Sequence, residues 1–328
     1  METVILFDTS IGSLNKGDEI IMESVVKQLH YIIENRYVMR STTHSPVISD
    51  KQGLCNNIIM ETFNNAKYKF ICGTNLLWRN LNYEWPTWNV NLLNYFPYRD
   101  SILIGVGSGK YHHEPDDYTK ELYNKILSHD YVHSVRDDNT VELLKTLGFQ
   151  AVNTGCPTMW GFSEEFCKKI PSEKAEKVVF TLTFYNMNNL LDQKLIDILF
   201  DSYKEVYFWS QGVNDFQYLK KLNLKRKLNI VPPDLKSYSR LLSDNNIDYI
   251  GTRLHGGLFA MQHKKRTIII VIDNRARYMK QNYSLKTIER QNIGLLKDTI
   301  FSSFKTKINL DYENIKKYIS QFDVIQYL

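Results

Sequence analysis

Arg253 and His255 stand two residues apart, where a short apolar strand is predicted to give way to a helix. The pattern predicts a strand over 248–250, a break at Gly251, and a helix that begins after an N-cap at Thr252. Unpaired backbone N–H groups and the positive end of the helix dipole meet in that first turn, so the turn favours an anion. A guanidinium, a titratable imidazole and a helix N-terminus together indicate a binding site capable of acid–base chemistry.

Two glycines, Gly256 and Gly257, follow inside the predicted helix. Each glycine in a helix interior costs about 1 kcal/mol relative to alanine. We therefore expect this pair to allow the close approach of a ligand or of another backbone. The next apolar strand, Ile268–Ile272, leads to Asp273, which is expected to orient a basic partner, and to Arg275, a candidate contact for phosphate or for an acceptor.

These residues need a scaffold that brings several strand ends together, and the rest of the chain predicts one. Strands are predicted at 4–7, 68–72, 101–106, 131–135, 150–153, 178–183, 205–209 and 228–231, with helices between most of them. Such alternation predicts parallel sheets covered by helices on both faces. Apolar periodicity stops around Lys168–Lys177, which we interpret as a linker between domains 1–168 and 176–328.

The first half also places polar residues at predicted strand ends, where α/β folds bind their ligands. Asn15 and Asp18 lie in a turn before the first helix, Gly107 lies in a glycine-rich strand end, and Arg136 follows the strand 131–135. Each has a purely structural alternative. Asp18 can complement the helix dipole, Arg136 can pair with one of the two aspartates that follow it, and the glycines alone are a weak phosphate-loop signal.

Seven aromatic residues, interleaved with asparagines, lie between Trp78 and Tyr98. Sugar C–H faces pack on aromatic rings, and sugar hydroxyls need hydrogen-bond donors and acceptors. The segment therefore suits a sugar-binding wall, with Trp78, Trp85 and Trp88 as contacts. The packing of a long loop explains the same composition equally well.

The 328 residues are 43% hydrophobic and 23% charged, which is typical of an ordinary globular protein with room for two domains. No apolar run is long enough to span a bilayer, and no secretory signal opens the chain, so a cytoplasmic location is expected. Residues 171–328 hold 25 Lys and Arg against 16 Asp and Glu. This excess favours an anionic ligand there or a solvated lysine surface, and no motif indicates nucleic acid.

No metal site is expected from the spacing of the possible ligands. The four cysteines, Cys55, Cys72, Cys156 and Cys167, lack the paired short spacing of a zinc site and are interpreted as free thiols. His112 and His113 are adjacent, so their side chains cannot easily share one ion.

The segment Gly251–Gly256, followed by an apolar helix, a strand and Asp273, resembles the signature of the polysaccharide pyruvyltransferase family. The turn Asn15–Asp18 and the segment Ser134–Asp137 match further motifs of that family. The resemblance implies a GT-B-like fold, with two Rossmann-like parallel-sheet domains facing a cleft. The first domain would be the acceptor side and the second the donor side, with a last helix over 312–321 packing back on the first.

The resemblance also implies transfer of a pyruvyl group from phosphoenolpyruvate to hydroxyls of a sugar in a surface polysaccharide, or exopolysaccharide, or its precursor. The product is a pyruvate ketal. Donor binding and catalysis map onto Arg253, Leu254, His255 and Arg136, and the flanking Thr252 and Gly256 are expected to contact substrate.

Phosphoenolpyruvate is a co-substrate, so no cofactor is expected. The acceptor would be a saccharide or a lipid-linked saccharide, the latter met at the inner face of the membrane. Two other functions remain open. One is a GT-B glycosyltransferase that places a nucleotide-sugar diphosphate on the same helix N-terminus, and the other is a non-catalytic sugar-binding protein.

Overall fold

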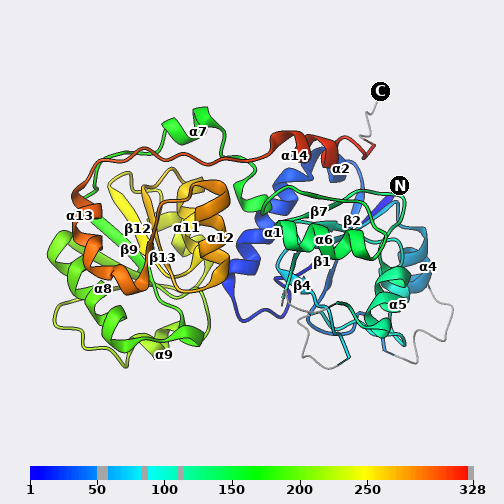
Figure 1. Ribbon diagram of the computed structural model, residues 1–328, viewed down its shortest axis with the longest axis horizontal. Coiled ribbons are helices and arrows are strands. Elements are labelled where there is room, and N and C mark those ends of the chain that lie inside the picture. The colour runs from blue at the N-terminus through cyan, green and yellow to red at the C-terminus, as the bar shows by residue number, and fades with distance from the viewer. Residues whose placement is uncertain (50–57, 83–87, 110–113, 324–328) are drawn as a thin grey trace. The chain divides into compact units, whose positions relative to one another are not determined.

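The computed structural model describes residues 1–49, 58–82, 88–109 and 114–323. The chain divides into two α/β units, each with its own hydrophobic core (Figure 1). Unit 1 comprises Met1–Ser13, Ile21–Trp160 and Asp311–Leu328, and unit 2 comprises Leu14–Ile20 and Gly161–Leu310. The linker predicted around 168–177 therefore lies inside unit 2, and the run that contains Asn15 and Asp18 belongs to unit 2 as well.

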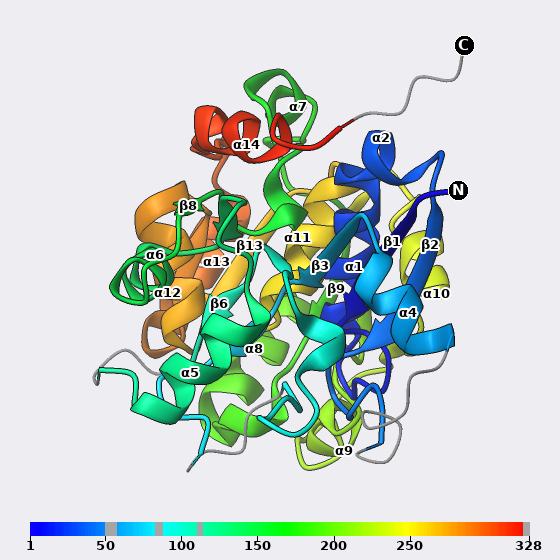
Figure 2. The same cartoon turned by 90° about the vertical axis from the view of Figure 1, so that its right-hand side faces the viewer.

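Unit 1 is built on a four-stranded parallel sheet in the order β2-β1-β3-β5, and Figure 2 shows β2, β1 and β3 side by side. Its strands are β1 (Thr3–Asp8), β2 (Tyr37–Thr42), β3 (Tyr68–Cys72) and β5 (Ile102–Ile104). Two further parallel pairs are formed by β4 (Asn75–Leu77) and β6 (Gly107–Ser108), and by β7 (His133–Val135) and β8 (Ala151–Asn153). Its helices are α2 (His30–Ile33), α4 (Ile58–Asn65), η1 (Phe96–Tyr98), α5 (Asp117–Ile126), α6 (Asp138–Thr146), η2 (Pro157–Met159) and α14 (Tyr312–Ile319), while α1 (Lys16–Gln28) begins in unit 2. β3 is buried throughout, as expected for a central strand of a parallel sheet.

Unit 2 is built on a six-stranded parallel sheet in the order β11-β10-β9-β12-β13-β14. Its strands are β9 (Lys177–Thr181), β10 (Glu205–Trp209), β11 (Asn229–Val231), β12 (Ile247–Gly251), β13 (Thr267–Val271) and β14 (Thr287–Glu289). Its helices are α7 (Glu164–Lys168), η3 (Phe184–Asn186), α8 (Asn189–Ser202), α9 (Asp215–Leu219), α10 (Leu235–Leu241), α11 (Leu254–Gln262), α12 (Asn274–Tyr283), η4 (Arg290–Leu295) and α13 (Leu296–Phe301). The predicted α/β class with parallel sheets is confirmed in both units.

The C-terminal helix α14 belongs to unit 1, where it contacts β7 and β8. Asn314 Nδ2 donates to the backbone oxygen of Asn153 at 3.1 Å, and Tyr318 is fully buried. Beyond the helix, Gln321 Nε2 donates to the backbone oxygen of Val132 at 2.9 Å. The segment from Asn314 to Gln321 is thus held by backbone acceptors at both ends of this strand pair. None of the helices in the described ranges has the length and apolar character needed to cross a bilayer.

Lys69 is a buried cation in β3, with 4% of its surface exposed. Burial lowers the pKa of its ammonium group to about 8, and the carboxylate of Asp100 counteracts this only in part. The ordinary pKa of lysine is 10.5, so the folded state binds this proton less tightly than the unfolded state does. Folding therefore carries a penalty below pH 8, which disappears as the pH rises from 8 to 10.5.

We expect Lys69→Met to stabilise the protein at pH 7 by up to about 3 kcal/mol, because it removes the cost of burying this charge. Urea unfolding at pH 7 and near pH 10.5 measures the effect, and the gain should vanish at the higher pH. Lys67→Met is the matched control, since Lys67 has a half-exposed ion pair with Asp323 and its loss should cost at most about 1 kcal/mol. Equal stability of Lys69→Met and wild type at pH 7 would contradict the prediction.

The fold brings four loops of unit 2 to one edge of its sheet. Because all six strands are parallel, the carboxyl ends of β9, β10, β12 and β13 lie at the same edge. The chain continues from these ends into η3, into Ser210–Asp215, into the start of α11 and into the start of α12. This edge holds the candidate site.

Candidate functional site

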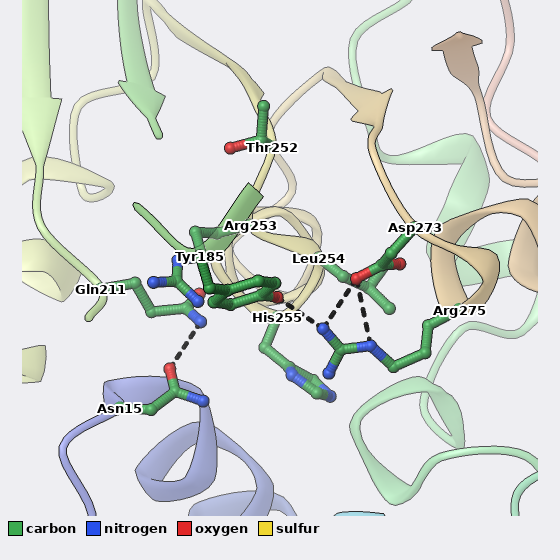
Figure 3. A pocket seen from close by; sticks show the side chains of 9 residues that line it. All are labelled: Asn15, Tyr185, Gln211, Thr252, Arg253, Leu254, His255, Asp273 and Arg275. Carbon is green, nitrogen blue, oxygen red and sulfur yellow. Dashed lines mark hydrogen bonds and ion pairs between the residues drawn. The ribbon is translucent and has the colours of Figure 1, made fainter. Parts of the chain in front are cut away.

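A cavity of about 120 Å³ lies at this carboxyl edge of unit 2 (Figure 3). The residues that line it are Asn15, Tyr185, Gln211, Thr252, Arg253, Leu254, His255, Asp273 and Arg275. All of them belong to unit 2, including Asn15 at the start of α1. The structure therefore brings together most of the site residues predicted in this unit, and it adds Tyr185 and Gln211, which the sequence did not single out.

Arg253 is held by a buried carboxylate. Its Nε donates to Asp215 Oδ2 at 2.9 Å, and its Nη2 donates to Asp215 Oδ1 at 2.5 Å. Asp215 is fully buried, and its oxygens also accept the backbone N–H groups of Gly212 and Phe184 at 2.7 and 3.2 Å. This two-point pairing fixes the plane of the guanidinium and compensates its charge. The sequence pattern did not single out Asp215 as a site residue.

The start of α11 differs from the prediction at one residue. The N-cap is Arg253 rather than Thr252, and it makes no side-chain cap. Thr252 Oγ1 lies 2.8 Å from Thr183 Oγ1 instead, so this hydroxyl joins the ends of β12 and β9. The capping acceptor comes from another loop, because Gln211 Oε1 accepts the backbone N–H of Gly256 at 2.8 Å. Predicting Thr252 as the N-cap was therefore wrong.

Gln211 also connects α11 to the start of α1. Its Nε2 donates to Asn15 Oδ1 at 2.8 Å, as Figure 3 shows, and its backbone oxygen accepts the N–H of Lys16 at 2.8 Å. Asn15 Oδ1 accepts the N–H of Gly17 as well, at 3.1 Å. These bonds fix the amide orientation of Asn15 at the cavity. Asp18, another predicted contact, is buried in the first turn of α1 and does not line the cavity.

The two glycines of α11 are explained by packing inside unit 2. A Cβ added at Gly257 would collide with Ile269 of β13 and lie 2.8 Å from the ring of Tyr249. A Cβ added at Gly256 would lie 3.1 Å from Gln211 Oε1 and 3.3 Å from the Tyr249 hydroxyl. We expected the close approach of a ligand or of another backbone at this pair. Gly257 faces side chains of the sheet, and Gly256 is not among the residues that line the cavity.

Gly257→Ala is expected to lower the free energy of unfolding by about 1–3 kcal/mol, because the added methyl group overpacks the contact between helix and sheet. Gly161→Ala is the matched control, since a Cβ there meets no heavy atom within 4 Å. Chemical denaturation of the two variants measures the difference. Equal stability of the two variants would contradict the prediction.

Arg275 forms the second arginine–aspartate pair of the cavity. Its Nη2 donates to Asp273 Oδ2 at 2.8 Å and to the Tyr185 hydroxyl at 2.6 Å (Figure 3). Asp273 Oδ1 accepts the N–H of Ala276 at 3.1 Å and thereby caps α12. Burial alone would raise the pKa of the Asp273 carboxyl, but Arg275 and the capping N–H bring it below its ordinary value. Asp273 thus remains ionised and orients a basic partner.

The charges of the two pairs cancel within the cavity. Arg253 is balanced by Asp215, and Arg275 is balanced by Asp273. His255 lies in the first turn of α11, lines the cavity and has 6% of its surface exposed. Its imidazole adds a group that can accept or donate a proton beside these paired charges.

The candidates of unit 1 lie at strand ends of that unit. Arg136 follows β7, is 6% exposed, donates to Asn75 Oδ1, and places Nε 3.8 Å from Asp137 Oδ2. A Cβ added at Gly107 would collide with the Arg136 guanidinium. Gly107 therefore makes room for this arginine, and the alternative of an ion pair with a following aspartate is present in the structure as a long contact.

The aromatic segment of unit 1 is used for packing at the positions the structure describes. Trp88 is fully buried in the core of unit 1 and packs edge-on against Tyr98, with ring centroids 5.5 Å apart. The assignment of Trp88 to a sugar-binding wall is therefore wrong. Trp78 is partly buried against the same core, and its backbone N–H and oxygen both bond the Tyr123 hydroxyl at 2.8 Å. Trp85 lies outside the described residues.

The described ranges contain no group of three or more His, Cys, Asp or Glu side chains placed to hold a metal ion. Cys72, Cys156 and Cys167 are buried free thiols, whereas Cys55, His112 and His113 lie outside the described residues. The side chains of the cavity point to anion binding and proton transfer instead.

Solved structures with a similar fold come from nucleotide-sugar enzymes. The UDP-GlcNAc 2-epimerase of Methanocaldococcus jannaschii, in complex with UDP-GlcNAc and UDP, aligns with a TM-score of 0.52 and 12% identity over 98% of each chain. A second structure of that enzyme gives 0.51 and 12% over 95% of each chain, and the S. aureus MnaA–UDP structure gives 0.50 and 11% over 99% of this chain and 92% of the other. At such identities the likeness shows a shared GT-B-like fold.

Sequence comparison identifies the family. No curated protein is significantly similar to the chain. A family model described as polysaccharide pyruvyl transferase matches residues 15–274, which include every cavity residue except Arg275, the residue next to its end. Because this match spans most of the chain and contains Arg253 and His255, the protein belongs to the polysaccharide pyruvyl transferase family and is a transferase.

Proposed function

We propose that this transferase moves a pyruvyl group from phosphoenolpyruvate to two hydroxyls of a saccharide in a surface polysaccharide or its precursor. The observation that carries the proposal is the cavity in which Arg253, His255 and Arg275 meet. Phosphoenolpyruvate carries a phosphate and a carboxylate on three carbons, and guanidiniums bind both groups with paired N–H donors. The N-terminus of α11 adds the partial positive charge of a helix end.

The atoms and protons of this reaction balance with two acceptor hydroxyls. A proton adds to the vinyl carbon while the first hydroxyl oxygen bonds to the neighbouring carbon that carries the phosphate. The bond from that carbon to the phosphate oxygen then breaks, and the second hydroxyl oxygen takes its place. One hydroxyl proton ends in the new methyl group and the other leaves with inorganic phosphate. The products are a pyruvate ketal and phosphate, and no further cofactor is needed.

His255 is the residue we assign to proton transfer. An imidazole both accepts and donates a proton near neutral pH, so it can deprotonate a hydroxyl and protonate the vinyl carbon or the phosphate. Arg253 stands two residues away with its guanidinium already oriented by Asp215. Such a preorganised donor stabilises charge that develops on a leaving phosphate without reorganising during the reaction.

We infer that the reaction takes place in the cytoplasm on a saccharide that is either free or lipid-linked. A lipid-linked acceptor would bring the protein to the inner face of the membrane. Assays with one glycoside in free form and on a lipid carrier in vesicles separate these cases. Turnover restricted to the free glycoside would exclude the membrane-linked acceptor.

Ligand-induced stabilisation tests the donor. Phosphoenolpyruvate at 100 times its dissociation constant should stabilise the folded protein by about 2.7 kcal/mol, and Arg253→Gln should abolish the effect. Arg226→Gln is the matched control, because Arg226 forms an exposed ion pair with Asp201. Stabilisation by a nucleotide-sugar and not by phosphoenolpyruvate would overturn the proposal in favour of a glycosyltransferase. Stabilisation by a saccharide alone would favour a non-catalytic binding protein.

A further inference from the structure

Tyr185 connects the two arginines of the cavity, although they come from different loops. It lies in η3, just after β9, and 52% of its surface is exposed. The Arg253 guanidinium carbon lies 5.0 Å from the centre of the Tyr185 ring, and the Tyr185 hydroxyl accepts from Arg275 Nη2 at 2.6 Å. Figure 3 shows the Tyr185 ring beside the Arg253 guanidinium and the Tyr185 hydroxyl directed at the Arg275 guanidinium.

The turn that carries Tyr185 is tied to both of those loops. The backbone N–H of Phe184 donates to Asp215 Oδ1 at 3.2 Å, and this is the carboxylate that pairs with Arg253. On the other side, Asn186 Nδ2 donates to the backbone oxygen of Ile272 at 2.6 Å, one residue before Asp273. Arg290 holds the same asparagine through its backbone and side-chain oxygens, at 2.6 and 3.0 Å. The position of the Tyr185 ring is therefore fixed by the loops on both sides.

The arginines present equivalent donors to a ligand. Arg253 uses Nε and Nη2 for Asp215, and Arg275 uses Nε and Nη2 for Asp273 and Tyr185. Across the described part of the chain, neither Nη1 has a hydrogen-bond partner. Two fixed guanidiniums thus retain one N–H-bearing nitrogen each for an incoming anion.

We propose that Tyr185 is a positioning residue, which holds the guanidiniums of Arg253 and Arg275 at a fixed separation for the two acidic groups of the donor. This inference rests on the proposed function, since the donor is taken to be phosphoenolpyruvate. The hydroxyl acts on Arg275 and the ring face acts on Arg253. Tyr185 itself transfers no proton and forms no bond to the substrate.

Graded substitution tests the inference by calorimetric titration with phosphoenolpyruvate and by steady-state kinetics. Tyr185→Phe, which loses only the hydroxyl, should raise the dissociation constant and KM for phosphoenolpyruvate about tenfold with kcat unchanged. Tyr185→Leu, which loses the ring as well, should raise both further. Tyr207→Phe is the matched control, because it removes a tyrosine hydroxyl that donates to Glu205 on β10, and it should change neither.

A double-mutant cycle distinguishes positioning from a general structural role. In an Arg275→Gln background, Tyr185→Phe should cause no further loss of donor affinity, because its effect passes through Arg275. Equal losses in both backgrounds, or unchanged affinity and KM in Tyr185→Phe, would overturn the inference. Inorganic phosphate is titrated in parallel. If wild type binds phosphate and not phosphoenolpyruvate, the donor assignment fails. The role of Tyr185 is then decided by whether Tyr185→Phe weakens phosphate binding in wild type and not in the Arg275→Gln background.

Discussion

Replacement of His255 by glutamine is expected to lower turnover by about 10²–10⁴-fold while phosphoenolpyruvate remains bound. Glutamine keeps hydrogen-bonding capacity at the cavity wall but cannot accept and return a proton. Arg253 and Arg275 are held by ion pairs with Asp215 and Asp273, so the substitution should leave both guanidiniums in place for donor binding. Phosphate release with a saccharide acceptor measures turnover, and calorimetric titration measures donor affinity in the same preparation.

His263→Gln provides the matched control because it changes a histidine at the opposite end of the same helix. His263 is the C-cap residue of α11, where its ring bonds Ser239 Oγ at 3.0 Å and the backbone oxygen of Phe259 at 2.9 Å. Its loss should affect stability slightly and turnover by less than about twofold. Unchanged turnover in His255→Gln would remove the imidazole from the proton-transfer step.

Asp215→Asn is expected to lower the free energy of unfolding by about 3–5 kcal/mol, because it leaves the Arg253 guanidinium buried without its counter-ion. The side chains of Arg253 and Asp215 are 5% and 0% exposed, so water does not reach the unpaired guanidinium to solvate it. The melting temperature should fall by roughly 10 °C for a chain of this size. Phosphoenolpyruvate should restore part of the loss, since its anionic groups supply the missing negative charge.

The exposed ion pair of Arg226 and Asp201 provides the control for the Asp215→Asn experiment. Their side chains are 57% and 54% exposed, so Asp201→Asn should change stability by less than about 1 kcal/mol. Thermal and urea unfolding of the two variants, with and without phosphoenolpyruvate, give the comparison. A loss in Asp215→Asn no larger than in Asp201→Asn would show that the buried pair does not hold Arg253.

Most of the sheet of unit 2 could be predicted, because its central strands β9, β12 and β13 are buried almost throughout. The strand 205–209 is predicted with the bounds it has in the structure, and β13 reads as a run of β-branched residues. In contrast, α12 carries the polar sequence NRARYMKQNY, and it has too few apolar residues for helical periodicity to reveal it. Apolar strands of a parallel sheet therefore leave a clear pattern in the sequence, whereas a mostly polar helix does not.

Some residues of the candidate site could likewise be found from the sequence, and others could not. Arg253, His255 and Arg275 could be found because each lies next to a recognisable strand end or motif. Tyr185 and Gln211 also follow strands, but their roles depend on partners in other loops, such as Gly256 for Gln211. Those pairings arise from the order of strands in the sheet, and local sequence does not contain that order.

In the aromatic segment of unit 1, the sequence suggested a binding role for residues that the structure uses for packing. Composition alone cannot separate a ring that faces a ligand from a ring that fills a core, and Trp88 and Tyr98 turned out to be fully buried. Both belong to the core cluster that also contains Phe7 of β1. Burial against a sheet is the more frequent use of such residues.

One measurement tests the central claim most directly, namely that the cavity of unit 2 transfers a pyruvyl group with His255 moving the protons. Wild type and His255→Gln are incubated with phosphoenolpyruvate and a saccharide that offers two neighbouring hydroxyls, and phosphate and ketal are quantified together. Wild type should release one phosphate for each ketal formed, and the variant should form neither at a comparable rate. Ketal formation at the wild-type rate by the variant, or no ketal from any saccharide with wild type, would contradict the claim.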